Sequence, residues 1–241
     1  MARDTTLVRL LDLVRHEARL SLNPAHNNQY RDHQVSALQR EQERLWADHD
    51  WPHLRVERDI TVYAGQRYFD LPSDLAVDRV EAIKVKSDGE WLTLSYGIGD
   101  GHYAAHDSDL DERSWPVQAW RIRQDGEDPP QIEVWPIPDQ DTDATTGEAT
   151  LRVVGIRKLR PLVADTDRAD LDDRLLALYV AAGILAARGE KDAQFKLEMA
   201  SKHMAALKGG LQKGVKIRMF GIGEDAPNRR LIINRYRPPV T

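Results

Sequence analysis

The stretch ERLWADHDWPHLRVERDITV, from Glu43 to Val62, contains the point at which the hydrophobic period of the chain changes. Up to Trp51-Pro52 the spacing of apolar residues is that of a helix, and beyond it apolar and charged residues alternate. One face of the alternating segment carries Leu54, Val56, Ile60 and Val62. A two-residue period predicts a half-buried strand, so a helical part and a β part of the chain meet here.

Two helices are expected before this point. The apolar residues of the first recur three and four positions apart and predict one buried stripe. They are Leu7, Leu10, Leu11, Val14 and Ala18. We expect Asn23-Pro24 to end this helix. The second helix runs from about Asn28 to His49 and has few apolar anchors, so we expect it to be exposed or to pack against neighbouring copies in an oligomer.

Six further segments have the character of strands, and turn signals rich in Gly, Pro and Asp separate them. They are QRYFDL, RVEAIKVK, EWLTLSY, VQAWRIR, QIEVWPI and ATLRVVGIRKL. One longer loop, from Gly97 to Trp115, precedes VQAWRIR. Many short strands of this kind predict a β-sandwich or barrel over residues 51–160.

Helical patterning returns after Pro161, in two segments that Gly189 separates and Gly209-Gly210 ends. The second segment carries Phe195, Leu197, Met199, Met204 and Leu207 as its apolar residues. We therefore predict an α+β fold in which residues 1–50 and 161–210 form one helical bundle. An antiparallel β-sandwich or barrel-like domain, residues 51–160, is inserted into it. Residues 211–241 are predicted to form an extended basic C-terminal arm.

Composition indicates a soluble protein. The chain of 241 residues has 41% hydrophobic and 30% charged residues and no cysteine, which excludes disulfides and thiolate metal sites. No signal peptide is visible, and the longest apolar run, LLALYVAAGILAA (175–187), is shorter than a membrane span. We expect no contact with a membrane.

The net charge of −5 is unevenly distributed. From Leu211 onward there are seven Lys or Arg against Glu224 and Asp225, a net of +5, so residues 1–210 carry −10. An acidic body with a basic tail is typical of an interaction arm that binds nucleic acid or an acidic protein surface. A tail that is merely solvated is the simpler alternative.

No motif for catalysis, cofactor binding or metal binding survives inspection. The phosphate-loop, nucleophile-elbow and zinc-protease patterns are absent. His102 and His106 stand four apart, but in an expected loop, so the spacing does not place them on one face. Two runs of alternating aspartates, at 107–111 and 139–143, lack the Gly and Glu that a calcium loop requires. We expect no enzyme activity and no cofactor.

GIGEDA, from Gly221 to Ala226, matches the dinucleotide fingerprint only in letters. The fingerprint needs a following helix and an acid about 20 residues later. Pro227 follows directly and NRRLIINRYRPP has strand-like character, with the chain ending at Thr241. We interpret Gly221 and Gly223 as a hinge instead.

The segment after this hinge is predicted to dock. Its expected docking residues are Met219, Phe220, Arg229, Arg230, Leu231, Ile232, Ile233 and Tyr236. Strand addition to a partner's sheet edge, helped by the arginines, fits an apolar terminal segment. The segment completing its own sheet, or lying across its own bundle, is an equal alternative.

Residues Ala37 to Val85 resemble the head-to-tail adaptor proteins of tailed bacteriophages. The resemblance is carried by a polar helix running into DHDWP (48–52), by GQRY (65–68), by LPSD (71–74) and by the following RVE strand. The later YGIGDGHYAAHDSD, QAWRI and QIEVWPIP, and the Ala-rich helix pair before the tail, are similar to the family as well. The resemblance covers most of residues 1–210 in organisation.

This resemblance implies a ring, of twelve copies, beneath the portal in the virion neck, assembled in the host cytoplasm. The ring would join the portal to a tail, stopper or nozzle protein and leave a channel through which DNA passes without sequence-specific binding. The arm would dock on the portal. An acidic body suits such a channel, because like charge discourages DNA from sticking.

Two other classes remain open at this point. All six tryptophans lie between Trp46 and Trp135, where they are expected to pack in the sheets or, alternatively, to form a platform that binds glycan or a host surface. An enzyme using paired carboxylates from the β loops is the third hypothesis, and no residue spacing supports it.

Overall fold

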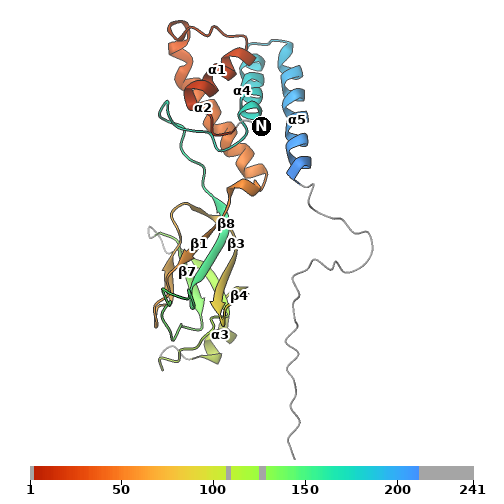
Figure 1. Ribbon diagram of the computed structural model, residues 1–241. Helices are drawn as coiled ribbons and strands as arrows, with labels where there is room; N and C mark the ends of the chain where they lie inside the picture. The colour runs from red at the N-terminus through yellow and green to blue at the C-terminus, as the bar shows by residue number, and fades with distance from the viewer. Residues whose placement is uncertain (1–2, 107–109, 125–128, 212–241) are drawn as a thin grey trace, which may run out of the picture.

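The computed structural model describes residues 3–106, 110–124 and 129–211, with the side chains of residues 24–29 and 210–211 excepted. Four helices lie at one end of the molecule and the strands at the other (Figure 1). The helices are α1 (Leu7–Glu17), α2 (Pro24–Asp48), α4 (Asp173–Ala187) and α5 (Asp192–Leu211). We call this part the helical half and the strands with their connections the β half. The architecture is α+β, as predicted.

Helix α4 is the centre of the helical half, since it contacts α1, α2 and α5. It is apolar almost all round, and Leu175, Leu176, Ala177, Val180 and Ala181 are at most 2% exposed. The predicted stripe of α1 packs against it in one core, which also contains Trp51 and Leu54. The helix starts later than the return of helical patterning at Pro161 suggested, because residues 158–172 first wrap over the start of α1.

Helix α2 corrects the expectation of an exposed or intermolecular helix. Its buried stripe is Gln34, Leu38, Gln42 and Leu45, all at most 3% exposed, and the two leucines belong to the core of the helical half. Half of this stripe is glutamine, which a count of apolar residues passes over. The helix also begins at Pro24, because Pro is well tolerated in a first helical turn.

The β half has two four-stranded sheets. The strands are β1 (Arg55–Ile60), β2 (Tyr68–Asp70), β3 (Leu75–Ser87), β4 (Glu90–Thr93), β5 (Ser95–Tyr96), β6 (Ala119–Arg123), β7 (Gln131–Trp135) and β8 (Leu151–Arg157). One sheet has the order β1-β8-β3-β4 and the other β2-β7-β6-β5. Side chains from both sheets, including Phe69, Ile83, Val134 and Val153, form one core between them. The β half is therefore a sandwich.

Two details differ from the sequence prediction. The segment EWLTLSY forms two strands, because Leu94 turns into the core and β4 and β5 join different sheets. Strand β5 pairs with β6 in parallel, so the second sheet is mixed rather than antiparallel. The expected loop from Gly97 to Trp115 contains a short helix, α3 (Asp100–Ala105).

Gly155 allows an irregularity in β3 that positions one arginine. The pairing of β3 with β8 shifts register between Leu75 and Val80 and again before Ala82. A Cβ on Gly155 would lie 2.7 Å from the carbonyl oxygen of Arg79 and 3.2 Å from Cα of Val80. Because only glycine leaves room for this approach, β3 can bulge against β8 and direct Arg79 toward the helical half.

Candidate assembly surface

The residues predicted to dock lie outside the part of the chain that the structure describes. This applies to the hinge glycines Gly221 and Gly223 and to every predicted arm residue: Met219, Phe220, Arg229, Arg230, Leu231, Ile232, Ile233 and Tyr236. The candidate site is therefore built from the body, residues 3–211. Its features are the junction between the halves, the start of α4 and a groove on the helical half.

Arg79 connects the bulge of β3 to the end of α2. Its guanidinium donates to the carbonyl oxygen of Ala47 at 2.7 Å, pairs with Asp50 at 3.1 Å and lies 4.2 Å from the ring centre of Trp46. The Nε1 of Trp46 donates to the carbonyl oxygen of Arg157 at 3.2 Å. Hydrogen bonds that involve Arg79 of β3 and Arg157 of β8 thus fix the orientation of the β half relative to α2.

Asp170 holds the second connection between the halves. Its buried carboxylate accepts from Arg157 and from both the main chain and the guanidinium of Arg160. Burial by itself would raise the pKa of Asp170, but these donors outweigh it and lower the pKa. The carbonyl oxygen of Asp170 lies 2.8 Å from Nε2 of His53. The carboxylate and main chain of Asp170 thus connect the end of β8, through Arg157, to His53 at the entry to β1.

The start of α4 buries two adjacent carboxylates. Asp172 caps the helix by accepting from the backbone N–H of Leu175 at 3.0 Å, and the same oxygen lies 2.8 Å from Nε2 of His203 on α5. Asp173 accepts from the hydroxyl of Thr5. Burial raises the pKa of Asp173, and the neighbouring Asp172 adds to that rise. These contacts connect α4 to the N-terminal segment and to α5.

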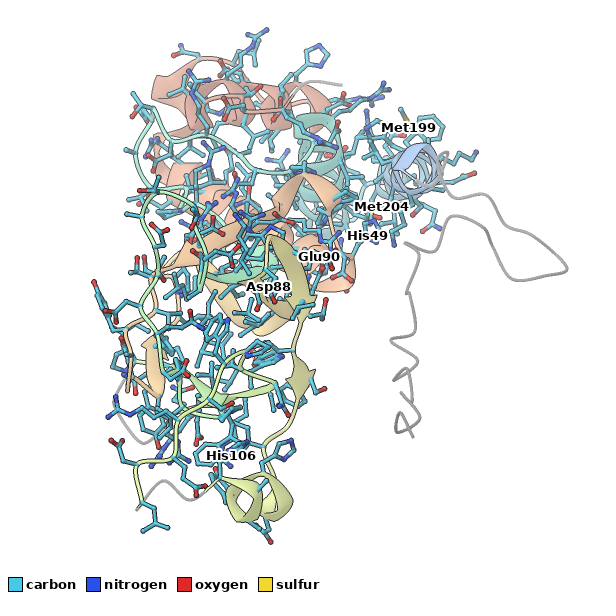
Figure 2. The ribbon with its side chains drawn as sticks, turned by 60° about the horizontal axis from the view of Figure 1, so that its bottom comes forward. His49, Asp88, Glu90, His106, Met199 and Met204 are labelled. Atoms are coloured by element: carbon cyan, nitrogen blue, oxygen red, sulfur yellow. The ribbon has the colours of Figure 1, made fainter. Side chains whose placement is uncertain are left out.

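Helix α5 is held near its N-terminal end by two ion pairs and nearer its C-terminal end by a short apolar seam. Lys196 pairs with Glu17 at 2.5 Å and Asp192 with Arg19 at 2.7 Å. Met204 and Leu207 are buried, whereas Phe195 is 60% exposed. Figure 2 shows Met204 on the side of α5 that is directed toward His49, the residue that follows α2. Burial lowers the pKa of His49, and the charge of Lys208 on α5 lowers it further.

The described residues offer little chemistry. No group of three or more His, Asp or Glu within them could hold a metal ion. His102 lies on α3 and His106 follows its last residue, so the two do not share a helical face; Figure 2 shows His106 at the end of the molecule away from His49. Glu133 is the most buried carboxylate of the β half. It forms ion pairs with Arg67 and Arg121 and accepts a hydrogen bond from the hydroxyl of Tyr103.

The tryptophans pack rather than form a platform. Trp51, Trp120 and Trp135 are at most 4% exposed. Among the others, Trp91 lies 4.0 Å beneath the guanidinium of Arg152, and Trp46 is covered by Arg79. None of the six is exposed, so their arrangement does not favour a glycan-binding face.

A groove runs along α4 between α2 and α5. It consists of three adjoining cavities of about 380, 190 and 350 Å³. Tyr179 and Gly183 line the first and the third, while Ala37 and Ile184 line the second and the third, so the cavities form one continuous feature. No pattern in the sequence indicated this groove. Within the described ranges, no helix has the length and apolarity that crossing a membrane requires.

Comparison with known proteins agrees with the resemblance noted in the sequence. No curated protein matches the chain. A family model described as SU10 adaptor protein matches residues 5–230. The match includes all of the helices and strands described above. It also extends beyond α5 into the predicted arm. The chain therefore belongs to the SU10 adaptor protein family.

Proposed function

We propose that this protein is a structural adaptor of the phage neck. It joins the portal to a downstream tail, stopper or nozzle protein, forms a ring of twelve copies and continues the DNA channel without enzymatic chemistry. The observation that carries the proposal is the family match over residues 5–230. Its place is the virion, at the interface between head and tail.

Three features of the chain support this role. The two halves are connected by hydrogen bonds and matched charges at Arg79 and Asp170, which suits a part that transmits force between two assemblies. The net charge of −10 on residues 1–210 discourages DNA from binding to the wall of a channel. The buried carboxylates of Glu133, Asp170 and Asp172 pair with arginine or histidine side chains in structural networks.

The arm is proposed to dock on the portal. Its basic and apolar residues fit an acidic surface with an exposed strand edge.

The boundaries of the parts likewise stay a prediction. They are a bundle of residues 1–50 and 161–210, an inserted domain of residues 51–160 and an arm of residues 211–241.

Deleting residues 212–241 tests the docking role, because the deletion removes none of the described structure up to Leu211. We expect a folded protein that no longer binds purified portal in a pull-down. Two matched variants separate the contributions: Arg229 and Arg230 changed to Gln, and Ile232 and Ile233 changed to Ser. Normal binding by the deletion variant would show that the arm does not dock on the portal.

Electron microscopy of the wild-type protein mixed with portal tests the class of function. We expect a ring stacked on the portal, with a count of subunits that can be read from the image. If no complex with the portal is seen at any mixing ratio of the two proteins, the adaptor role is contradicted.

A further inference from the structure

A hollow of about 460 Å³ opens between the two sheets of the β half, next to Arg79. Side chains of β3, β5 and β6 line it. The edge strands beside it are short, because β4 pairs only with Lys84–Ser87 of β3 and β5 has two residues. Within the described residues, the part of β3 around Arg79 therefore has β8 on one side and no strand on the other. This part of the strand edge is open.

The hollow combines an exposed aromatic ring with carboxylates. Tyr96 is 74% exposed, and its ring packs edge-on against the buried Trp120 with 4.9 Å between the ring centres. Asp78 is exposed and has no ion-pair partner among the described residues, whereas Glu81 pairs with Arg55 at 2.8 Å. In the described part of the chain, no lysine, arginine or histidine lines the hollow. An aromatic ring next to a free carboxylate suits a guanidinium group.

Contacts of arginine with aromatic rings recur in this protein. Arg152 lies 4.0 Å from the ring centre of Trp91, and Arg44 lies 4.6 Å from that of Tyr179. Tyr96 differs, since no guanidinium of the described residues lies over its ring. The hollow thus has the surroundings of an arginine contact without the arginine.

The C-terminal arm of the same chain has the complementary chemistry. Its segment RRLIINRY (229–236) places arginines on both sides of an apolar run. The chain from Leu211 onward carries +5 and residues 1–210 carry −10, so the arm and the body attract each other. An extended segment can bond through its main chain to an open strand edge while its side chains enter a hollow beside that edge.

The arm begins close to the hollow. Helix α5 ends at Leu211, and the charge of its Lys208 lowers the pKa of His49, just after α2. Arg79 of the open edge contacts Ala47 at the same end of α2. In Figure 1, α5 accordingly ends near the level at which the strands begin. The 17 residues from 212 to 228 can span about 55–60 Å when extended, so residues 229–236 can reach the hollow.

We propose that, in the free protein, residues 229–236 of the arm lie in the hollow of their own chain, along the open edge of β3 and with an arginine against Tyr96 and Asp78. A segment held there cannot dock elsewhere at the same time, so docking of the arm on the portal requires its release. The inference goes beyond the proposed function and does not depend on it, because it concerns the protein before it meets a portal.

Amide hydrogen exchange of the whole chain without portal, followed by mass spectrometry, tests the contact. A tethered segment has an effective concentration of about 1 mM, so a contact with an affinity of about 0.1 mM slows its exchange about tenfold. We expect this slowing over residues 229–236 in the wild type, its loss in Tyr96→Ala and its reduction in Asp78→Asn. Tyr63→Ala and Asp88→Asn are the matched controls and should keep it, because both side chains are exposed and neither lines the hollow.

The other outcomes overturn the proposal. Fast exchange of residues 229–236 in the wild type would show that the free protein does not hold the arm. Slowing that persists in both Tyr96→Ala and Asp78→Asn would place the arm on another surface. Slowing that increases with protein concentration would make a second copy the occupant. None of these results changes the portal pull-down, so the proposed function is tested separately.

The same measurement reports whether each variant folds, because the amides of α4 exchange slowly only in folded protein. Tyr96 and Asp78 are both exposed, so we expect both variants to fold. If Tyr96→Ala nevertheless lost protection of α4, Asp78→Asn with its control Asp88→Asn would decide the outcome.

Discussion

The β half and the helical half bury charge in different ways. In the β half, Glu133 is fully buried and accepts from Arg67, Arg121 and the hydroxyl of Tyr103. Burial would raise its pKa, but the two arginines outweigh this and lower it. In the helical half, Asp173 is equally buried, its donor is the neutral hydroxyl of Thr5, and its pKa is raised.

The unpaired polar atoms follow the same division. Among the described residues, the buried side-chain atoms without a hydrogen-bond partner are Nε of Arg3, Nε2 of Gln34, Oε1 of Gln42, Nε2 of His49 and Oδ1 of Asp173. All belong to the helical half or its edge. Since a buried polar group without a partner costs free energy, the packing of the helical half is less complete than that of the β half within the described residues.

The largest expected effect breaks the charge network of the β half. Glu133→Ala leaves Arg67 and Arg121 facing each other without their shared carboxylate, so we expect a loss of about 3–5 kcal/mol in the free energy of unfolding. Urea denaturation followed by tryptophan fluorescence measures it. Glu57→Ala, which removes an exposed partner of Arg152, is the control and should cost about 1 kcal/mol or less. Equal losses in the two variants would contradict the difference described here.

The next effect tests the bulge that aims Arg79. Gly155→Ala puts a methyl group 2.7 Å from the carbonyl oxygen of Arg79, and main chain cannot move aside as a side chain can. We expect a loss of about 1–3 kcal/mol, as for an overpacked core. The thermal midpoint reports it, and an unchanged midpoint would show that β3 accommodates the methyl group.

The matched glycine of the helical half should respond in the opposite direction. Gly183→Ala meets no atom within 4 Å and replaces glycine in the interior of α4. We expect a gain of up to about 1 kcal/mol from helix propensity, measured by the same urea titration. A loss of stability would mean that α4 needs glycine here for a reason within the single chain.

The smallest effect depends on pH and concerns Asp173. Its folded-state pKa is raised, so its protonated form stabilises the fold fully below the unfolded pKa, and this contribution is lost as the pH rises through the folded value. Asp173→Asn removes that loss and keeps an oxygen for Thr5. We therefore expect the variant to gain stability relative to the wild type between pH 4 and pH 7. Urea midpoints at the two pH values test this, and an equal difference at both would contradict it.

The opposite sign applies to Glu133 and Asp170. Their pKa values are lowered, so their contribution is present above the unfolded values and is lost as the pH falls through the folded ones. This behaviour is common to the wild type and to Asp173→Asn, so it cancels in the comparison of the two.

Much of this architecture could be predicted from the sequence, because the helices and strands follow from the local period of apolar residues. The change of period at Trp51-Pro52 located the entry to the strands, and Leu7, Leu10, Leu11 and Val14 located the buried face of α1. Helix α5 was found, but the exposure of Phe195 was not, because its place depends on which face of the helix meets α4. Gly155, inside a strand pattern, was a usable signal of a bulge or close backbone approach.

What the sequence by itself determined is the order of elements, the α+β class and the split between an acidic body and a basic tail. These depend on residues that are close along the chain. Only the tertiary structure decided that Gln34 and Gln42 lie in a core, that Arg79 reaches the end of α2, and that α2, α4 and α5 line a groove. Such features depend on distant segments meeting in space, where packing and hydrogen bonding override the local pattern.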